Sequence, residues 1–124
     1  MNPGLTKTYV AQGDIPARAF VKAGSADGTV AVASAATDAI IGVNERLDVS
    51  DGDRVDVIHS GIAESVAAGP IAFGDFLTAG TSGKAMTAAP AAGVNARVGG
   101  MALQSALAAG DIIDFLVTPT RVQG

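Results

Sequence analysis

The dipeptide Gly-Asp occurs four times in this chain, and an apolar or β-prone run follows each copy. Glycine adopts the positive φ that a tight turn needs, and an aspartate that follows it accepts a hydrogen bond from a nearby backbone N–H. We therefore expect four turns that each lead into a strand. These turns are Gly13-Asp14, Gly52-Asp53, Gly74-Asp75 and Gly110-Asp111.

Two of these turns lie inside longer segments that correspond without a gap. The segment "IGVNERLDVSDGDRVDV" from Ile41 matches "GGMALQSALAAGDIIDF" from Gly99 at a shift of 58 positions. Self-similarity at a fixed spacing indicates a repeated structural unit. We expect two related halves, about residues 13–58 and 74–115. The valine and isoleucine at equivalent positions, Val55 and Ile113, should be buried, and Asp56 and Asp114 should lie nearer solvent or an interface.

The runs between the turns have the pattern of short strands. Valines alternate with polar or small residues at 29–32 and 54–57, which is the period of two of a half-buried strand. The run "IIDFLV" at 112–117 is more uniformly apolar, so we expect its own sheet and a partner subunit to cover its two faces. Short strands with turn signals every 8 to 15 residues favour an all-β fold, a small barrel with an approximate internal two-fold repeat and at most short helical turns.

Two Gly-containing stretches are predicted to be exposed hairpin tips. They are "SADG" at 25–28 and "TSGK" at 81–84. Gly28 and Gly83 should have turn conformations there, because only glycine takes positive φ without steric cost.

The domain organisation that we predict is one β domain at 13–117, an N-terminal arm at 1–12 and a C-terminal tail at 118–124. In the arm, "LTKTYV" alternates in the manner of a strand, which leaves two alternatives. The arm is either a frayed tail or an edge strand that adds to a sheet of a neighbouring chain. On the second alternative, the residues that contact the neighbouring chain are Leu5, Lys7, Tyr9 and Val10.

Composition excludes several classes of function. The formal net charge is −4 and aromatic residues make up 4%, which argues against nucleic-acid binding. The chain has no Cys, hence no disulfide and no thiolate metal site. No stretch approaches the roughly 20 apolar residues of a membrane span, and the first residues lack the apolar core of a signal peptide. We expect a soluble protein made in a cytoplasm, with no membrane partner.

The sequence contains no complete motif for a metal, phosphate or catalytic site. Aspartates at 48, 51, 53 and 56 do not form a calcium loop, because Leu47 occupies its first ligand position. The stretch "TAGTSGKA" lacks the first Gly and the final Ser or Thr of a phosphate-binding loop. His59 is the only histidine and has no partner motif, so a surface or interface role is expected. We predict no enzyme, no cofactor, no metal and no catalytic residue.

Four segments in order carry a family resemblance. They are "YVAQGDIPARAF", "IGVNERLDVSDGDRVDVIHSG", "IAFGDFLTAGTSGKAMTA" and "GGMALQSALAAGDIIDFLV", and together they extend from about Tyr9 to Val117. Each segment alone has a composition that is common in turns and strands. Their order and spacing together resemble those of the capsid decoration, or cement, proteins of tailed bacteriophages.

The resemblance implies a β-barrel or β-tulip like that of the lambda-type decoration protein. It implies a structural virion protein that binds the outer surface of a capsid and stabilises the expanded head. The implied partners are the major capsid protein and the chain itself, as a homodimer or homotrimer. The implied location is the virion, after assembly in the host cytoplasm.

Two other classes stay open. One is a ligand-binding β-barrel module, for example for host-surface carbohydrate, although sugar sites favour exposed aromatics and the chain has one Tyr and four Phe. The other is a small enzyme or enzyme subunit, which lacks a convergent set of His, Cys or carboxylates.

Overall fold

The computed structural model describes residues 2–124, and it is built almost entirely of β-strands. The all-β prediction is confirmed. A single turn of 3-10 helix, η1, is the one helical element among the described residues. The strands are β1 (Asn2–Pro3), β2 (Thr6–Ala11), β3 (Phe20–Ala23), β4 (Thr29–Val32), β5 (Ile40–Asn44), β6 (Arg54–Ile58), β7 (Gly61–Val66), β8 (Phe76–Ala79), β9 (Ala85–Thr87), β10 (Asn95–Ala102) and β11 (Ile112–Gln123), with η1 at Thr81–Gly83.

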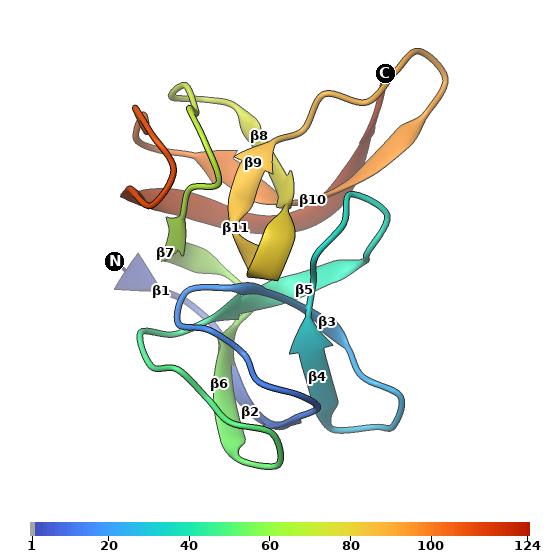
Figure 1. Ribbon diagram of the computed structural model, residues 1–124, viewed down its shortest axis with the longest axis vertical. Coiled ribbons are helices and arrows are strands. Elements are labelled where there is room, and N and C mark those ends of the chain that lie inside the picture. The colour runs from blue at the N-terminus through green and yellow to red at the C-terminus, as the bar shows by residue number, and fades with distance from the viewer. Residues whose placement is uncertain (1) are drawn as a thin grey trace.

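The strands form two lobes, one above the other in Figure 1. Lobe 1, residues 6–58, is a closed barrel in the order β2-β4-β3-β5-β6. Lobe 2, residues 61–123, contains β7 to β11 in a sheet of order β1-β7-β11-β10-β8-β9. A bridge between Ala67 and Ala85 links the end of β7 to β9, so the second sheet also curls back on itself.

The two lobes have the same strand pairings. β3 pairs with β4 and β5, and β5 with β6, in lobe 1; β8 pairs with β9 and β10, and β10 with β11, in lobe 2. The register agrees as well, because the pair Val43 and Ile58 corresponds to Met101 and Leu116 at the shift of 58. The predicted internal repeat is confirmed.

The facing of the repeated strands also matches the prediction. Val55 and Ile113 are both fully buried, whereas Asp56 is exposed and Asp114 is half-buried. Val55 and Ile113 therefore face inward in the same way, although Val55 packs in the core of lobe 1 and Ile113 in the cluster that joins the lobes.

Each repeat begins one strand earlier than the sequence indicates. Thr6–Ala11, predicted as part of a separate arm, forms β2 and pairs with β6 over its whole length up to Val10. In lobe 2, β7 pairs with β11 in the same way. Residues 6–11 are thus the first strand of lobe 1, and the frayed-tail alternative does not describe them. The shift between β2 and β7 is 56 rather than 58, since Thr6 opposite Ile58 corresponds to Ile62 opposite Leu116.

The predicted C-terminal tail is also strand. β11 continues through residues 118–123 and pairs with the first half of β10, so that Thr120 lies opposite Val98 and Gln123 opposite Asn95. This hairpin projects at the upper right of Figure 1. The register slips between Val98 and Gly100, and Pro119 is accommodated there because a bulge does not need its missing N–H.

The run 112–117 is covered on one face rather than on both. Ile113, Phe115 and Val117 point into the core, whereas Ile112 is half exposed and Leu116 only partly buried. β7 and β10 flank this strand within its own chain. Covering of its outer face by a second subunit therefore stays a prediction.

The core joins the two lobes. The rings of Phe20 and Phe115, one from each lobe, meet edge to face with centroids 5.3 Å apart. Both belong to one cluster of buried residues drawn from β3, β5 and β6 in lobe 1 and from β7 to β11 in lobe 2, and a second cluster fills the barrel of lobe 1. A Cβ on Gly99 would come within 2.6 Å of the Phe20 ring, so the glycine permits this close approach.

The two predicted hairpin tips differ in burial. Gly28 has φ +77° and is exposed. Gly83 has φ +75°, but it is buried, because the tip at 81–84 folds against lobe 1. A Cβ on Gly83 would lie 2.6 Å from the Ala19 Cβ and 2.9 Å from the Val32 Cγ2. The expectation that the whole second tip is exposed is therefore wrong for Gly83.

Candidate contact surfaces

The four residues predicted as contacts lie on or just before β2. Leu5, Lys7 and Val10 are exposed, and Tyr9 is partly buried. Lys7 and Tyr9 share one face of the strand, with the Lys7 Nζ 5.3 Å from the centre of the Tyr9 ring. Val10 lies on the opposite face, so the four side chains do not form one continuous patch. Whether they contact another chain stays a prediction.

Tyr9 is fixed to lobe 1 through His59. The Tyr9 hydroxyl lies 2.7 Å from His59 Nε2, and His59 Nδ1 lies 2.7 Å from the carbonyl oxygen of Ile41. A carbonyl only accepts, so Nδ1 carries the proton and donates, and neutral Nε2 then accepts from the tyrosine. His59 thus orients an aromatic side chain on β2, and this use accounts for the only histidine of the chain.

The four Gly-Asp pairs sit at loop ends with positive φ at each glycine, between +84° and +95°. Three of the aspartates accept hydrogen bonds from backbone N–H groups of these loops. Asp14 binds the N–H of Asp51, Asp75 that of Ala72, and Asp111 those of Leu107 and Ala108. Asp53 uses its backbone instead, donating to the Ser50 carbonyl oxygen at 3.0 Å. Positive φ at the glycine and hydrogen bonds of this kind within the loop are typical of tight turns.

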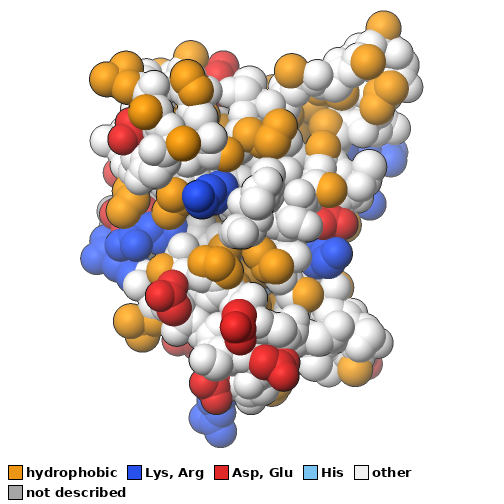
Figure 2. Space-filling view, in the orientation of Figure 1, with side chains coloured by type: hydrophobic (Ala, Val, Ile, Leu, Met, Phe, Trp, Pro, Cys, Tyr) orange, Lys and Arg blue, Asp and Glu red, His pale blue; other side chains and the backbone are white. Residues whose placement is uncertain are grey.

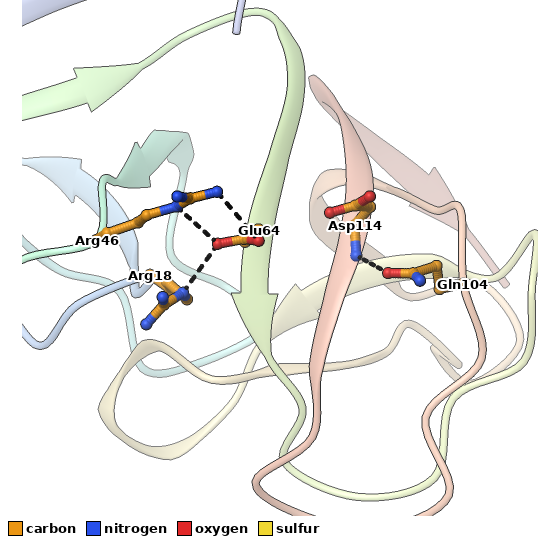
Figure 3. Close-up of polar contacts among 5 residues, drawn as sticks. All are labelled: Arg18, Arg46, Glu64, Gln104 and Asp114. Carbon is orange, nitrogen blue, oxygen red and sulfur yellow. Dashed lines mark hydrogen bonds and ion pairs between the residues drawn. The ribbon is translucent and has the colours of Figure 1, made fainter. Parts of the chain in front are cut away.

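One carboxylate joins the lobes on the surface. Glu64 of β7 accepts from Arg18 Nε at 3.1 Å and from Arg46 Nε at 3.0 Å, and both arginines stand on loops of lobe 1 (Figure 3). Burial raises the pKa of Glu64, but the hydrogen bonds and positive charges of the two arginines outweigh it and hold that pKa below its usual value. Arg18 has φ +61°, an unusual conformation for a residue with a side chain. The contact therefore fixes a strained loop residue against lobe 2.

The carboxylate of Asp114 lies across the strand pair from Glu64, and the Asp114 backbone N–H donates to the Gln104 side chain at 2.7 Å (Figure 3). Gln104 belongs to the loop before β11. This bond ties the loop before β11 to β11 itself.

The loops at the Gly-Asp end of each lobe have contrasting chemistry. In lobe 1 the loops 12–19 and 45–53 carry five acidic residues, and Asp14 and Asp48 line a shallow depression of about 340 Å³. In lobe 2 the loops 67–75 and 103–111 carry two, Asp75 and Asp111, and no Lys or Arg. Figure 2 shows acidic side chains gathered over the lower lobe, and hydrophobic ones spread over the upper lobe.

No group of three or more His, Cys, Asp or Glu side chains that suits a metal ion occurs within residues 2–124. The acidic residues at 48 and 51 accept hydrogen bonds from the N–H groups of Ala17 and Gly13 instead. In the same part of the chain, no helix has the length and apolar character to cross a membrane.

Comparison with known proteins decides between the classes. The profile of the phage cement protein family matches residues 1–118. The chain belongs to the phage cement protein family. Membership makes it a structural phage head protein and confirms the resemblance found in the sequence.

The fold agrees with a solved phage structure. The N base of the head fiber protein gp8.5 of bacteriophage phi29 superimposes with a TM-score of 0.69 over 97% of this chain and 98% of that chain, at 20% identity. Identity this low shows a shared fold alone. No curated protein sequence matches the chain.

Proposed function

We propose that this cement family protein binds the outer surface of a phage capsid and stabilises the expanded head. The observation that carries the proposal is the family match over residues 1–118. The fold suits the role, because a closed barrel and a curled sheet that share a core cluster give a compact particle in which most strand edges are paired. The net charge of −4 favours a position outside the shell, away from packaged DNA.

We propose that the protein functions on the shell as a homodimer or homotrimer, with the major capsid protein as its partner. β2 offers the subunit contact. It pairs with β6 along one edge, but among the described residues it pairs with β4 only at Val10 and Ala11. The edge of β2 from Thr6 to Tyr9 can therefore accept a strand of an adjacent subunit, flanked by the exposed side chains of Leu5 and Val10.

Co-sedimentation with phage heads tests the capsid proposal. Purified protein is mixed with expanded and unexpanded heads of the phage that encodes it, and the bound fraction is measured. We expect saturable binding to expanded heads and an increase in their thermal resistance to DNA release. If the protein does not bind expanded heads, the capsid proposal is wrong. If it binds but does not raise the thermal resistance of the heads, only the proposed stabilisation is wrong.

Two measurements test the role of β2 in contacts between copies. Analytical ultracentrifugation of the protein alone gives its oligomeric state, and binding curves with expanded heads give the cooperativity between adjacent copies. Leu5→Ser and Val10→Ser remove exposed apolar groups and leave the buried core intact. We expect both to reduce contacts between adjacent copies, seen as weaker cooperativity of head binding. Unchanged cooperativity in both variants would remove β2 from the interface.

A further inference from the structure

The internal repeat allows each exposed side chain of one lobe to be compared with its counterpart in the other. In lobe 1, Ile15 and Val49 form an isolated bridge, and in lobe 2 the equivalent bridge joins Ile71 and Ala106. Next to these bridges, the N–H of Ala17 donates to Asp48, and the N–H of Phe73 donates to Ser105. The same backbone scaffold therefore supports both pairs of loops.

This equivalence shows two replacements and one additional residue in lobe 2. Phe73 stands where lobe 1 has Ala17. Leu107 has no counterpart, because it lies between Ala106, which forms its bridge as Val49 does, and Ala108, whose carbonyl accepts from the Asp111 N–H as the Ser50 carbonyl accepts from the Asp53 N–H. Ile112 lies opposite Val66 as Arg54 lies opposite Val10. The exposed fractions of Phe73, Leu107 and Ile112 are 70%, 87% and 50%. Lobe 1 adopts the same fold with alanine and arginine at the positions of Phe73 and Ile112, and without a counterpart of Leu107, so folding does not require the large apolar side chains.

The loops around these side chains carry no Lys or Arg and only two carboxylates. Both carboxylates, Asp75 and Asp111, accept hydrogen bonds within the loops, from Ala72 and Thr87 and from Leu107 and Ala108 respectively. Loops 67–75 and 103–111 touch each other through the Phe73 bond to Ser105 and lie together at the upper left of Figure 1. An apolar surface presented in this way, with no function in the fold, is typical of a contact site.

We propose that this end of lobe 2, through Phe73, Leu107 and Ile112, is the face that seats on the assembled capsid shell, in an apolar hollow of the shell protein. The inference rests on the proposed function and names the surface that serves it. The acidic end of lobe 1 then points into solvent.

The size of the surface favours the shell over a second copy of the chain. One exposed Phe, one Leu and one half-exposed Ile offer roughly a few hundred Å², since a whole aromatic side chain buries about 150–250 Å². A stable interface buries about 800 Å² on each partner. Small contacts of this kind hold when many are multiplied over a lattice, as on a capsid.

The test removes the apolar side chains without touching the buried core. The double variant Phe73→Ala with Leu107→Ser gives position 73 the alanine that lobe 1 carries and replaces the exposed Leu107 by a small polar residue. Leu47→Ser, on a loop of lobe 1 where Leu47 is 76% exposed, is the matched control. Binding to expanded heads is measured by co-sedimentation, and oligomeric state by ultracentrifugation. We expect at least a tenfold weaker affinity for the double variant and a change below twofold for the control.

The outcomes separate this inference from the proposed function. If the wild-type protein does not bind heads, the proposed function fails, and the inference fails with it. If the wild type binds and the double variant binds equally well, only the inference is overturned. If the double variant loses its self-association while single subunits still bind, the occupant is a second copy, and the inference is again wrong.

A cross-linking measurement covers the case in which the double variant does not fold. A photo-reactive phenylalanine analogue replaces Leu107 or, in a separate protein, Leu47. We expect cross-links to the shell protein from position 107 and none from position 47. Cross-links from position 47 alone would overturn the inference.

Discussion

The ring of Phe20, from lobe 1, meets the ring of Phe115, from lobe 2, at an interplanar angle of 84°. Both rings are fully buried, and Gly99 leaves the space in which Phe20 lies. Two copies of a repeat thereby share one core, so we expect the lobes to unfold together.

Phe115→Ala should lower the free energy of unfolding by about 3–5 kcal/mol, because it removes a buried ring and leaves a cavity between the lobes. Chemical denaturation followed by circular dichroism measures the effect. Phe73→Ala is the control, and it should be nearly neutral since that ring is exposed. A loss below about 1 kcal/mol for Phe115→Ala would contradict a shared core.

Gly83→Ala and Gly28→Ala separate two effects at the hairpin tips. Both glycines have nearly the same positive φ, +75° and +77°, so both variants carry a backbone cost of about 1–2 kcal/mol. At Gly28 an added Cβ meets nothing within 4 Å, whereas at Gly83 it meets Ala19 and Val32. We expect Gly83→Ala to cost about 1–3 kcal/mol more than Gly28→Ala, measured by thermal or chemical unfolding. Equal costs would mean that the tip at 81–84 is not packed against lobe 1.

Stability should fall at acidic pH partly through Glu64. Its pKa is lowered in the folded state, so its contribution is present above the unfolded value near 4.5 and is lost as the pH falls through the folded pKa. In Glu64→Gln the decrease in unfolding free energy below pH 4.5 should be smaller than in the wild type. Asp38 also has a lowered pKa, chiefly because the Ser34 N–H binds its carboxylate, so part of the decrease should persist. An identical pH profile in both proteins would exclude a role for the arginine contacts.

Removal of residues 1–10 should unfold lobe 1 rather than trim a tail. The deletion takes away β2, its pairing with β6 and the Tyr9 bond to His59. Removal of residues 1–3 alone spares β2 and serves as the control. Circular dichroism and proteolysis measure the outcome, and a folded, protease-resistant 1–10 deletion would show that β2 is dispensable.

The repeat was visible in the sequence because its signals are local. A turn at Gly52 or Gly110 needs positive φ within the dipeptide itself, and alternation at Val55 or Ile113 reports the facing of a single strand. Such chemistry does not depend on distant residues. The absence of helical periodicity, and hence the all-β fold, was predictable for the same reason.

The first strand of each repeat could not be recognised as part of the repeat from the sequence. Thr6–Val10 and Ile62–Val66 share only the final valine, and loops of different length change the shift from 56 to 58. Their equivalence lies in the partner, because each pairs with the strand after a Gly-Asp turn some 50 residues further along the chain. These two strands are specified by that long-range pairing and not by their own composition.

The sequence by itself determined the turns, the strand alternation and the family. Only the tertiary structure decided that the lobes share the Phe20–Phe115 contact, that Gly83 is buried, and that Phe73 replaces Ala17 on an equivalent loop. The physical reason is that turn conformations depend on neighbouring residues, whereas burial and equivalence in space depend on which distant segments pack together.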